Sequence, residues 1–176
     1  MKKAIKKYLT QLHENEEKGF SLVELIIVMA IMAILVGVVA SQVIPYMEKS
    51  RQSKDQQQIS GLATDITAAL ASSAVTAQDV AAGTKVDSGV AAMAANATDA
   101  SKIEAELESL RGDVSSVAAV ATSVKNKLKS KAATDGTKTD GEIYMQYDVA
   151  TSKLTLYMSS DGTLANAVNK LTVESE

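Results

Sequence analysis

The chain has 176 residues, enough for one domain of ordinary size and an additional segment. Its net charge is −3 and its pI about 5.3, so no overall basic character points to nucleic acid as a partner. The absence of Cys and the single His, His13, exclude disulfides and thiolate metal sites and argue against a His-based metal site or a Ser-His-Asp triad.

The N-terminal segment, residues 1–19, is basic, with five Lys and three acids. It precedes an apolar stretch, so its positive charge favours a cytoplasmic N-terminus under the positive-inside rule. The preference is weak, because Lys49, Arg51 and Lys54 follow closely behind the apolar stretch.

Residues 20–44 are almost wholly apolar. An unbroken run of apolar residues and Gly extends from Leu25 to Ala40, and Glu24 is the one charged residue between Lys18 and Glu48. At about 1.5 Å of rise per residue, a helix over 25–44 spans roughly 30 Å, the thickness of a bilayer hydrocarbon core. We therefore predict a single transmembrane helix here.

The helix is expected to continue beyond Pro45, so that one long helix covers about Phe20–Ser73. Its second half has a narrow apolar face, with polar residues assigned to the opposite side. The apolar face comprises Ile59, Leu62, Ile66 and Leu70, and the polar side Lys54, Asp55, Gln57 and Asp65. Residues 77–100 have the composition of a loop with at most one helical turn.

A second helical region follows, with apolar residues spaced as in a heptad seam. The seam comprises Ile103, Leu107, Leu110, Val114, Val117, Ala121, Val124 and Leu128. Gly112 and Asp113 interrupt it, and Asp113 could cap a new helix. We prefer a helix or helix pair that packs within its own domain over an intermolecular coiled coil.

Near the C-terminus, residues 142–148 and 153–159 alternate apolar and polar residues and predict a β-hairpin. Its core face would carry Ile143, Met145, Tyr147, Leu154, Leu156 and Met158. Asp161-Gly162 marks a turn, and Thr163–Lys170 could form a short helix.

The junction Glu17-Lys18-Gly19-Phe20-Ser21-Leu22-Val23-Glu24-Leu25 resembles the class III signal peptide of type IV pilins and of the pseudopilins of type II secretion and competence systems. The resemblance is sharp over about residues 17–44. It implies that a prepilin peptidase cuts between Gly19 and Phe20 on the cytoplasmic side and that the new amine of Phe20 is methylated. It also implies that Glu24 is the acid embedded in the assembled apolar core.

The chemistry of this junction gives the motif a physical purpose. An ionisable group in a membrane span is costly, so it normally has a partner. Cleavage at Gly19 would create a positive amine at Phe20, four residues before Glu24, and the Glu24 of an incoming copy could meet the Phe20 amine of a neighbour. That pair would set the axial register of a helical filament with an apolar core.

Three other interpretations of the junction remain open. Glu24 could be an acid favoured by the dipole at a helix start. The segment could be an ordinary secretory signal cut after Val38-Val39-Ala40, or an uncleaved single-pass anchor. The mature chain would begin at methylated Phe20, at Ser41 or at Met1, depending on which interpretation holds.

The chain departs from the family pattern in three places. The Pro that often kinks the pilin helix is replaced by Ser41, so we expect the bend at Gly37 or Pro45. The C-terminal disulfide loop of many pilins is impossible without Cys. The Ala-rich middle with its heptad seam is more helical than is usual for the family's globular part.

Other chemistry has little support in the sequence. Residues 135–142 gather oxygen ligands that could suit calcium, but the spacing is not an EF-hand and a plain turn is favoured. A run of lysines, Lys125, Lys127, Lys129 and Lys131, could touch DNA or an anionic surface, but a solvated helix end is favoured. We expect no catalytic residues, no metal and no cofactor, and we predict no contact with nucleic acid.

The predicted architecture is α+β: a leader (1–19), a transmembrane or filament-core helix (20–44) and a small head (45–176) with further helices and a C-terminal antiparallel sheet. The leading functional prediction is a non-enzymatic pilus subunit, held in the cytoplasmic membrane and then assembled into an extracellular filament for adhesion or motility. Its partners would be copies of itself, prepilin peptidase, and the pilus assembly platform and ATPases. The alternatives are a pseudopilin of a secretion or DNA-uptake system and an uncleaved, membrane-anchored coiled-coil binding protein.

Overall fold

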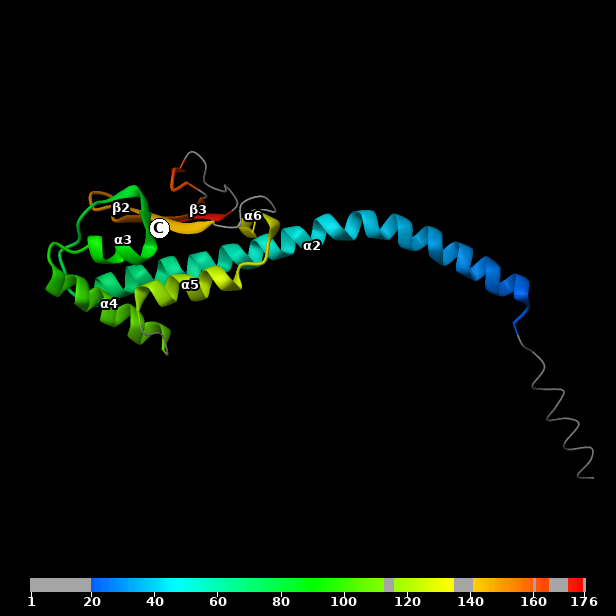
Figure 1. The fold of residues 1–176 in the computed structure, drawn as a ribbon, viewed down its shortest axis with the longest axis horizontal. Helices are drawn as coiled ribbons and strands as arrows, with labels where there is room; N and C mark the ends of the chain where they lie inside the picture. The colour runs from blue at the N-terminus through cyan, green and yellow to red at the C-terminus, as the bar shows by residue number, and fades with distance from the viewer. Residues whose placement is uncertain (1–19, 113–115, 135–140, 160, 165–170, 176) are drawn as a thin grey trace, which may run out of the picture. The chain divides into compact units, whose positions relative to one another are not determined.

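The computed structural model describes residues 20–112, 116–134, 141–159, 161–164 and 171–175. The chain divides into two compact units, Met1–Pro45 and Tyr46–Glu176, and we refer to the second as the head. In chain order the elements are α2 (Leu22–Ser72), β1 (Val80–Lys85), α3 (Val86–Ala92), α4 (Ala97–Arg111), α5 (Val117–Lys127), α6 (Lys131–Thr134), β2 (Glu142–Asp148), β3 (Lys153–Ser159) and β4 (Thr172–Glu174) (Figure 1).

The long N-terminal helix predicted from the sequence is confirmed as α2, a single helix of 51 residues. Pro45 lies inside it and removes one backbone donor without ending the helix. Residues 20–47 are exposed on every side of the helix. In the head, by contrast, Ile59, Leu62 and Ile66 are fully buried, as their spacing predicts.

The assignment of Asp55 to the polar side of this helix is wrong. Asp55 is only 2% exposed and lies on the same side as the buried residues. It precedes Ile59 by four positions, which places the two side chains one above the other on a helix. Asp65, on the predicted polar side, is half-buried and forms an ion pair with Arg111 at 2.6 Å.

The sheet of the head is antiparallel, with strand order β1-β2-β3-β4, and Figure 1 shows it on one side of the helices. The predicted hairpin is confirmed as β2 and β3. Met145 pairs with Leu156 at its centre. Directly opposed residues point to the same face, so the predicted core face is correct and is buried against the helices.

The loop predicted over residues 77–100 is wrong in most of its length. It contains β1, α3 and the beginning of α4. Only Val80 of β1 is buried, so the strand carries no alternating apolar signal of its own. Its pairing with β2 is irregular between Val80 and Thr84, where Gly83 adopts a φ of 88°, a value that favours glycine.

The heptad seam is divided between two helices that pack within the head. Gly112, at a φ of 72°, ends α4, and Ser116 caps α5 by accepting a hydrogen bond from the Ala119 amide. Ile103, Leu107, Val117 and Val124 are buried in the same cluster as the sheet. Leu110 is 49% exposed, so its place in the seam is wrong. The proposed cap Asp113 lies outside the described residues, as does Val114.

The predicted turn at Asp161-Gly162 is confirmed by a φ of 81° at Gly162 and by hydrogen bonds from Thr163 to the Asp161 carboxylate. Most of the helix predicted for Thr163–Lys170 lies outside the described residues. β4 was not predicted; it adds a short edge strand to β3.

Candidate processing and assembly site

The apolar helix begins immediately after the predicted cleavage position. Phe20 precedes α2 and is 87% exposed, while the Ser21 carbonyl accepts the first helical hydrogen bond, from the Leu25 amide at 3.1 Å. Ser21 therefore occupies the N-cap position. Gly19, the other residue of the predicted scissile bond, lies outside the described residues.

The Glu24 carboxylate has a partner within its own chain. Its Oε2 accepts a hydrogen bond from the Ser21 amide at 2.8 Å. This is one half of a capping box, in which an acid in the first turn satisfies a backbone donor at the N-cap and also faces the positive end of the helix dipole. The structure thus gives the helix-start interpretation of Glu24 a definite contact, in the chain before cleavage.

The helix beyond Glu24 presents an uncovered apolar surface. From Leu25 to Ala40 every residue is apolar or Gly, and all of them are exposed. Among the described residues α2 is the one helix long and apolar enough to cross a membrane. So much contiguous apolar surface is not stable in water, so the helix requires lipid or other apolar helices around it.

The two residues predicted to bend the helix, Gly37 and Pro45, both lie within α2, which is helical at each of them. A Cβ added at Gly37 would meet nothing within 4 Å. The bend itself remains a prediction, for which the missing donor of Pro45 supplies the physical cause.

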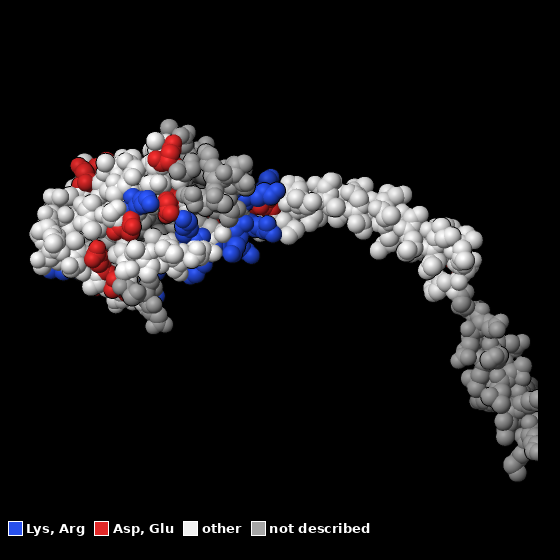
Figure 2. Space-filling view, viewed as in Figure 1, with Lys and Arg blue, Asp and Glu red and all other residues white. Residues whose placement is uncertain are grey.

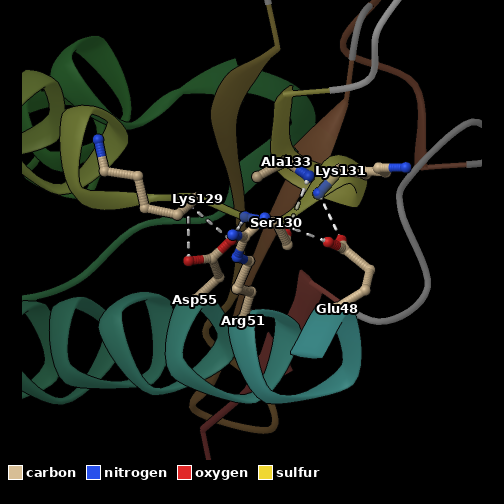
Figure 3. A network of polar contacts seen from close by, with 7 residues as sticks. All are labelled: Glu48, Arg51, Asp55, Lys129, Ser130, Lys131 and Ala133. Carbon is tan, nitrogen blue, oxygen red and sulfur yellow. Dashed lines mark hydrogen bonds and ion pairs between the residues drawn. The ribbon is translucent and has the colours of Figure 1, made fainter. Parts of the chain in front are cut away.

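A polar network that we did not predict joins α2 to the segment after α5 (Figure 3). The Asp55 carboxylate accepts hydrogen bonds from the Lys129 amide, at 2.9 and 3.0 Å, and from the Ser130 amide, at 2.7 Å. The Glu48 carboxylate accepts one from the Lys131 amide. These contacts connect residues that are more than 70 positions apart and fix the segment to the first turns of α2 in the head.

The fixed segment also has its own internal support. The Ser130 hydroxyl accepts a hydrogen bond from the Ala133 amide at 3.2 Å. On α2 itself, Arg51 approaches Glu48 at 4.0 Å. We refer to the residues drawn in Figure 3 as the Asp55 network; they are Glu48, Arg51, Asp55, Lys129, Ser130, Lys131 and Ala133. Helical periodicity could have indicated that Asp55 is buried, because it is in phase with Ile59, but not that its partners are distant backbone amides.

Several charged groups elsewhere in the described part of the head form pairs. Lys125 bonds Glu142 at 2.7 Å, so it is engaged within the head. At the start of α4, hydrogen bonds from Lys102 and Asn96 hold the pKa of the Asp99 carboxyl below its usual value. In the part of the chain that the structure describes, no group of His, Cys, Asp and Glu could hold a metal ion, and residues 135–140 of the calcium candidate lie outside that part.

Comparison with known proteins gives one match. Residues 15–40 match the family model described as the prokaryotic N-terminal methylation motif. No curated protein and no solved structure matches the chain. The matched range contains the basic end of the leader, the Gly19-Phe20 junction, Glu24 and most of the apolar helix.

The motif has consequences for processing, location and chemistry. It implies processing by prepilin peptidase and assembly into pilus-like filaments, and together with the apolar helix it indicates a membrane-anchored, pilus-associated precursor. The proteins that carry it are structural rather than enzymatic. The N-terminal methylation motif places this α+β chain, with its long apolar helix, in the type IV pilin and pseudopilin superfamily.

Proposed function

We propose that the chain is a structural subunit of a type IV pilus, cut between Gly19 and Phe20 and methylated at Phe20. The observation that carries this proposal is the uncovered apolar part of α2, which begins at the motif and contains one acid, Glu24. A helix of this kind is suited to storage in lipid and to close packing with copies of itself.

Cleavage would change the partners available to Glu24. In the precursor its carboxylate accepts from the neutral Ser21 amide. After the cut, a positive amine stands at Phe20, and a charge-assisted hydrogen bond is stronger than a neutral one. Within one subunit, Phe20 lies outside the helix, ahead of Glu24. Between subunits, the amine of one copy meets the Glu24 of the next and gives each new copy a fixed axial position.

This division of roles follows from the energetics of membranes. Inside the membrane an apolar helix gains little hydrophobic free energy by moving from lipid to a bundle of apolar helices, because lipid tails are equally apolar. Outside the membrane the same surface is stable only when it is buried against other copies, so burial holds the filament together. The interaction energy of a charged pair in apolar surroundings changes far more with the distance between its atoms than the energy of an apolar contact does. The apolar surface therefore supplies cohesion, and the pair of Glu24 and Phe20 supplies register.

The assembled chain would be extracellular and the stored chain would be a single-pass protein of the cytoplasmic membrane. Prepilin peptidase would process it on the cytoplasmic side, and the assembly platform with its ATPases would extract it from the membrane. The filament would serve adhesion, twitching motility or DNA uptake. A pseudopilin of a secretion or competence system carries the same motif and is the second candidate.

Shearing of filaments from the producing cells tests the proposal. Long surface fibres in which mass spectrometry finds this chain as a component support the pilus. Absence of such fibres, together with loss of protein secretion or of transformation when the gene is deleted, contradicts the pilus and supports the pseudopilin. Retention of residues 1–19 with no polymer contradicts both.

A further inference from the structure

Basic side chains from two distant parts of the chain meet at one end of the head. Figure 2 shows blue side chains gathered around the first turns of α2 in the head. We define the basic patch as Lys49, Arg51, Lys54, Lys127, Lys129 and Lys131. All six residues are exposed.

The Asp55 network brings these cations together. It binds the backbone amides of Lys129 and Lys131 to carboxylates of α2, so both residues lie beside the helix that carries Lys49, Arg51 and Lys54. Figure 3 shows the side chains of Lys129 and Lys131 extending away from the carboxylates that hold their amides. The backbone is fixed while the ammonium groups point outward.

The acids of this region do not cancel the outward charge. Asp55 is 2% exposed and accepts hydrogen bonds from backbone amides, whereas the side chain of Glu48 is 18% exposed, with Oε1 on the Lys131 amide and Oε2 at 4.0 Å from Arg51. Glu48 therefore offsets part of the charge of Arg51 and leaves the five lysines of the patch without an acid from this pair. Lys125 is not part of the patch, because it pairs with Glu142. Among the described residues, the surface left to an approaching ligand is therefore positive, although the whole chain has a net charge of −3.

The patch follows the apolar stretch along one helix. Lys49 lies about 8 Å of helical rise beyond Ile44, at the outer edge of the polar headgroup layer, which adds roughly 5–7.5 Å to each side of a bilayer. Tyr46, between them, is 76% exposed. An exposed Tyr at this position is typical of the boundary between hydrocarbon and water, where its ring lies in apolar surroundings and its hydroxyl in polar ones.

We propose that the basic patch binds anionic phospholipid headgroups at the membrane face from which the head emerges. Clustered Lys and Arg next to a membrane span are attracted to anionic lipid over about one Debye length, roughly 10 Å at 0.1 M salt. The contact holds stored subunits with the patch toward the membrane and is lost when a subunit is drawn into the filament. It requires only that α2 is inserted in a bilayer, so it is independent of the filament role.

Two matched variants of the full-length chain test the proposal. The patch variant is Lys127→Gln with Lys129→Gln and Lys131→Gln; the control variant is Lys85→Gln with Lys102→Gln and Lys153→Gln, which removes the same charge from exposed sites elsewhere in the head. The lysines of residues 1–19 are present in both variants and contribute equally. Circular dichroism establishes that each variant has the wild-type helix content.

Each protein is reconstituted in bilayers, and its association with spin-labelled phosphatidylglycerol is measured relative to spin-labelled phosphatidylcholine. We expect the control variant to keep the wild-type preference and the patch variant to lose about half of it or more, with the difference abolished by about 0.5 M salt. Equal preference in the two variants overturns the proposal. So does a difference that appears only at high protein density, which indicates a second copy as the partner, or one that appears only with added duplex DNA.

Discussion

Glu24 is the residue to which we assign both the cap of the precursor helix and the assembly contact. It lies in an apolar helix, and in the precursor it accepts a hydrogen bond from the Ser21 amide. This cap lowers the cost of carrying an acid in the membrane before any other copy is present. Under the proposed function, the in-chain cap and the contact between copies are successive states of one side chain rather than competing explanations.

Glu24→Gln separates these two states. The amide oxygen of Gln can still accept from the Ser21 amide, but the charge that attracts the Phe20 amine is lost. We expect unchanged cleavage and a fall in filament yield of about tenfold or more, because a hydrogen bond between charged groups contributes about 1.5–3 kcal/mol. Immunoblots of sheared filaments and of membrane-held subunits measure both quantities.

The control for this variant is Asp87→Asn, which removes an exposed carboxylate of the head and should assemble normally. Wild-type fibre yield from a Glu24→Gln strain would contradict the proposal that the charge of Glu24 sets the axial register of the filament. If Glu24→Ala assembled as poorly as Glu24→Gln, the charge rather than the cap would be decisive.

Gly19→Asp tests the position of the cut. A charged side chain next to the scissile bond should prevent cleavage, leaving a precursor that is heavier by the mass of residues 1–19. Gly19→Ala, which adds one methyl group, is the milder comparison. Intact-mass measurement of membrane protein reads the result, and mature protein from the Gly19→Asp strain would move the cut elsewhere.

Asp55, which the sequence pattern assigned to the polar side of the helix, is buried and holds two backbone amides of the segment after α5. Asp55→Ala should lower the free energy of unfolding by about 3 kcal/mol, because the amides of Lys129 and Ser130 lose a charged acceptor. Urea unfolding of the full chain in detergent micelles measures the change. Gln57→Ala, at an exposed position on the same helix, should alter stability by less than about 0.5 kcal/mol; equal losses would show that the network has no special weight.

At the scale of elements, α2 changes character along its length. Residues 20–47 are exposed all round, which suits a helix surrounded by lipid or by other copies. From Asp55 to Ala69 the buried residues form a stripe, which suits a helix packed on one side of a globular domain. The Asp55 network begins at Glu48, where the one pattern gives way to the other.

The contact between α3 and β2 offers a test of the head's packing. A Cβ on Gly89 would come within 2.2 Å of the buried Met145 sulfur, whereas one on Gly61 of α2 would meet nothing within 4 Å. Gly89→Ala should destabilise the head by about 1–3 kcal/mol through overpacking. Gly61→Ala should leave stability unchanged or raise it by up to about 1 kcal/mol, since Ala is the better helix former. Thermal unfolding of both variants measures these changes. Unchanged stability of Gly89→Ala would contradict the close approach of Gly89 to the Met145 side chain.

The elements that sequence could predict are those with their own periodicity. The hairpin of β2 and β3 alternates strictly, and the apolar helix is unmistakable by length. β1 was missed because its exposed Ala and Gly residues carry no pattern; its place in the sheet depends on pairing with β2. Asp55 was misassigned because polarity was given more weight than helical phase, although its partners, backbone amides more than 70 positions away, have no signature in the sequence.

At the scale of the whole molecule, the chain has two parts with different environments. The apolar helix carries the methylation motif and is suited to membranes and filament cores, while the head folds around a single hydrophobic cluster without any disulfide. Its stability must come from packing and from contacts such as the Asp55 network. Removal of residues 1–19 should leave the head's unfolding midpoint unchanged, because among the described residues the hydrophobic cluster of the head begins at Ile59.

The terminus of the protein isolated from its native cells tests the central claim most directly. N-terminal sequencing combined with intact-mass measurement should find a chain that begins at Phe20 and carries one methyl group on its amine. A chain that begins at Met1 or at Ser41 would contradict this account, because Glu24 would then have no amine of a neighbouring copy to meet.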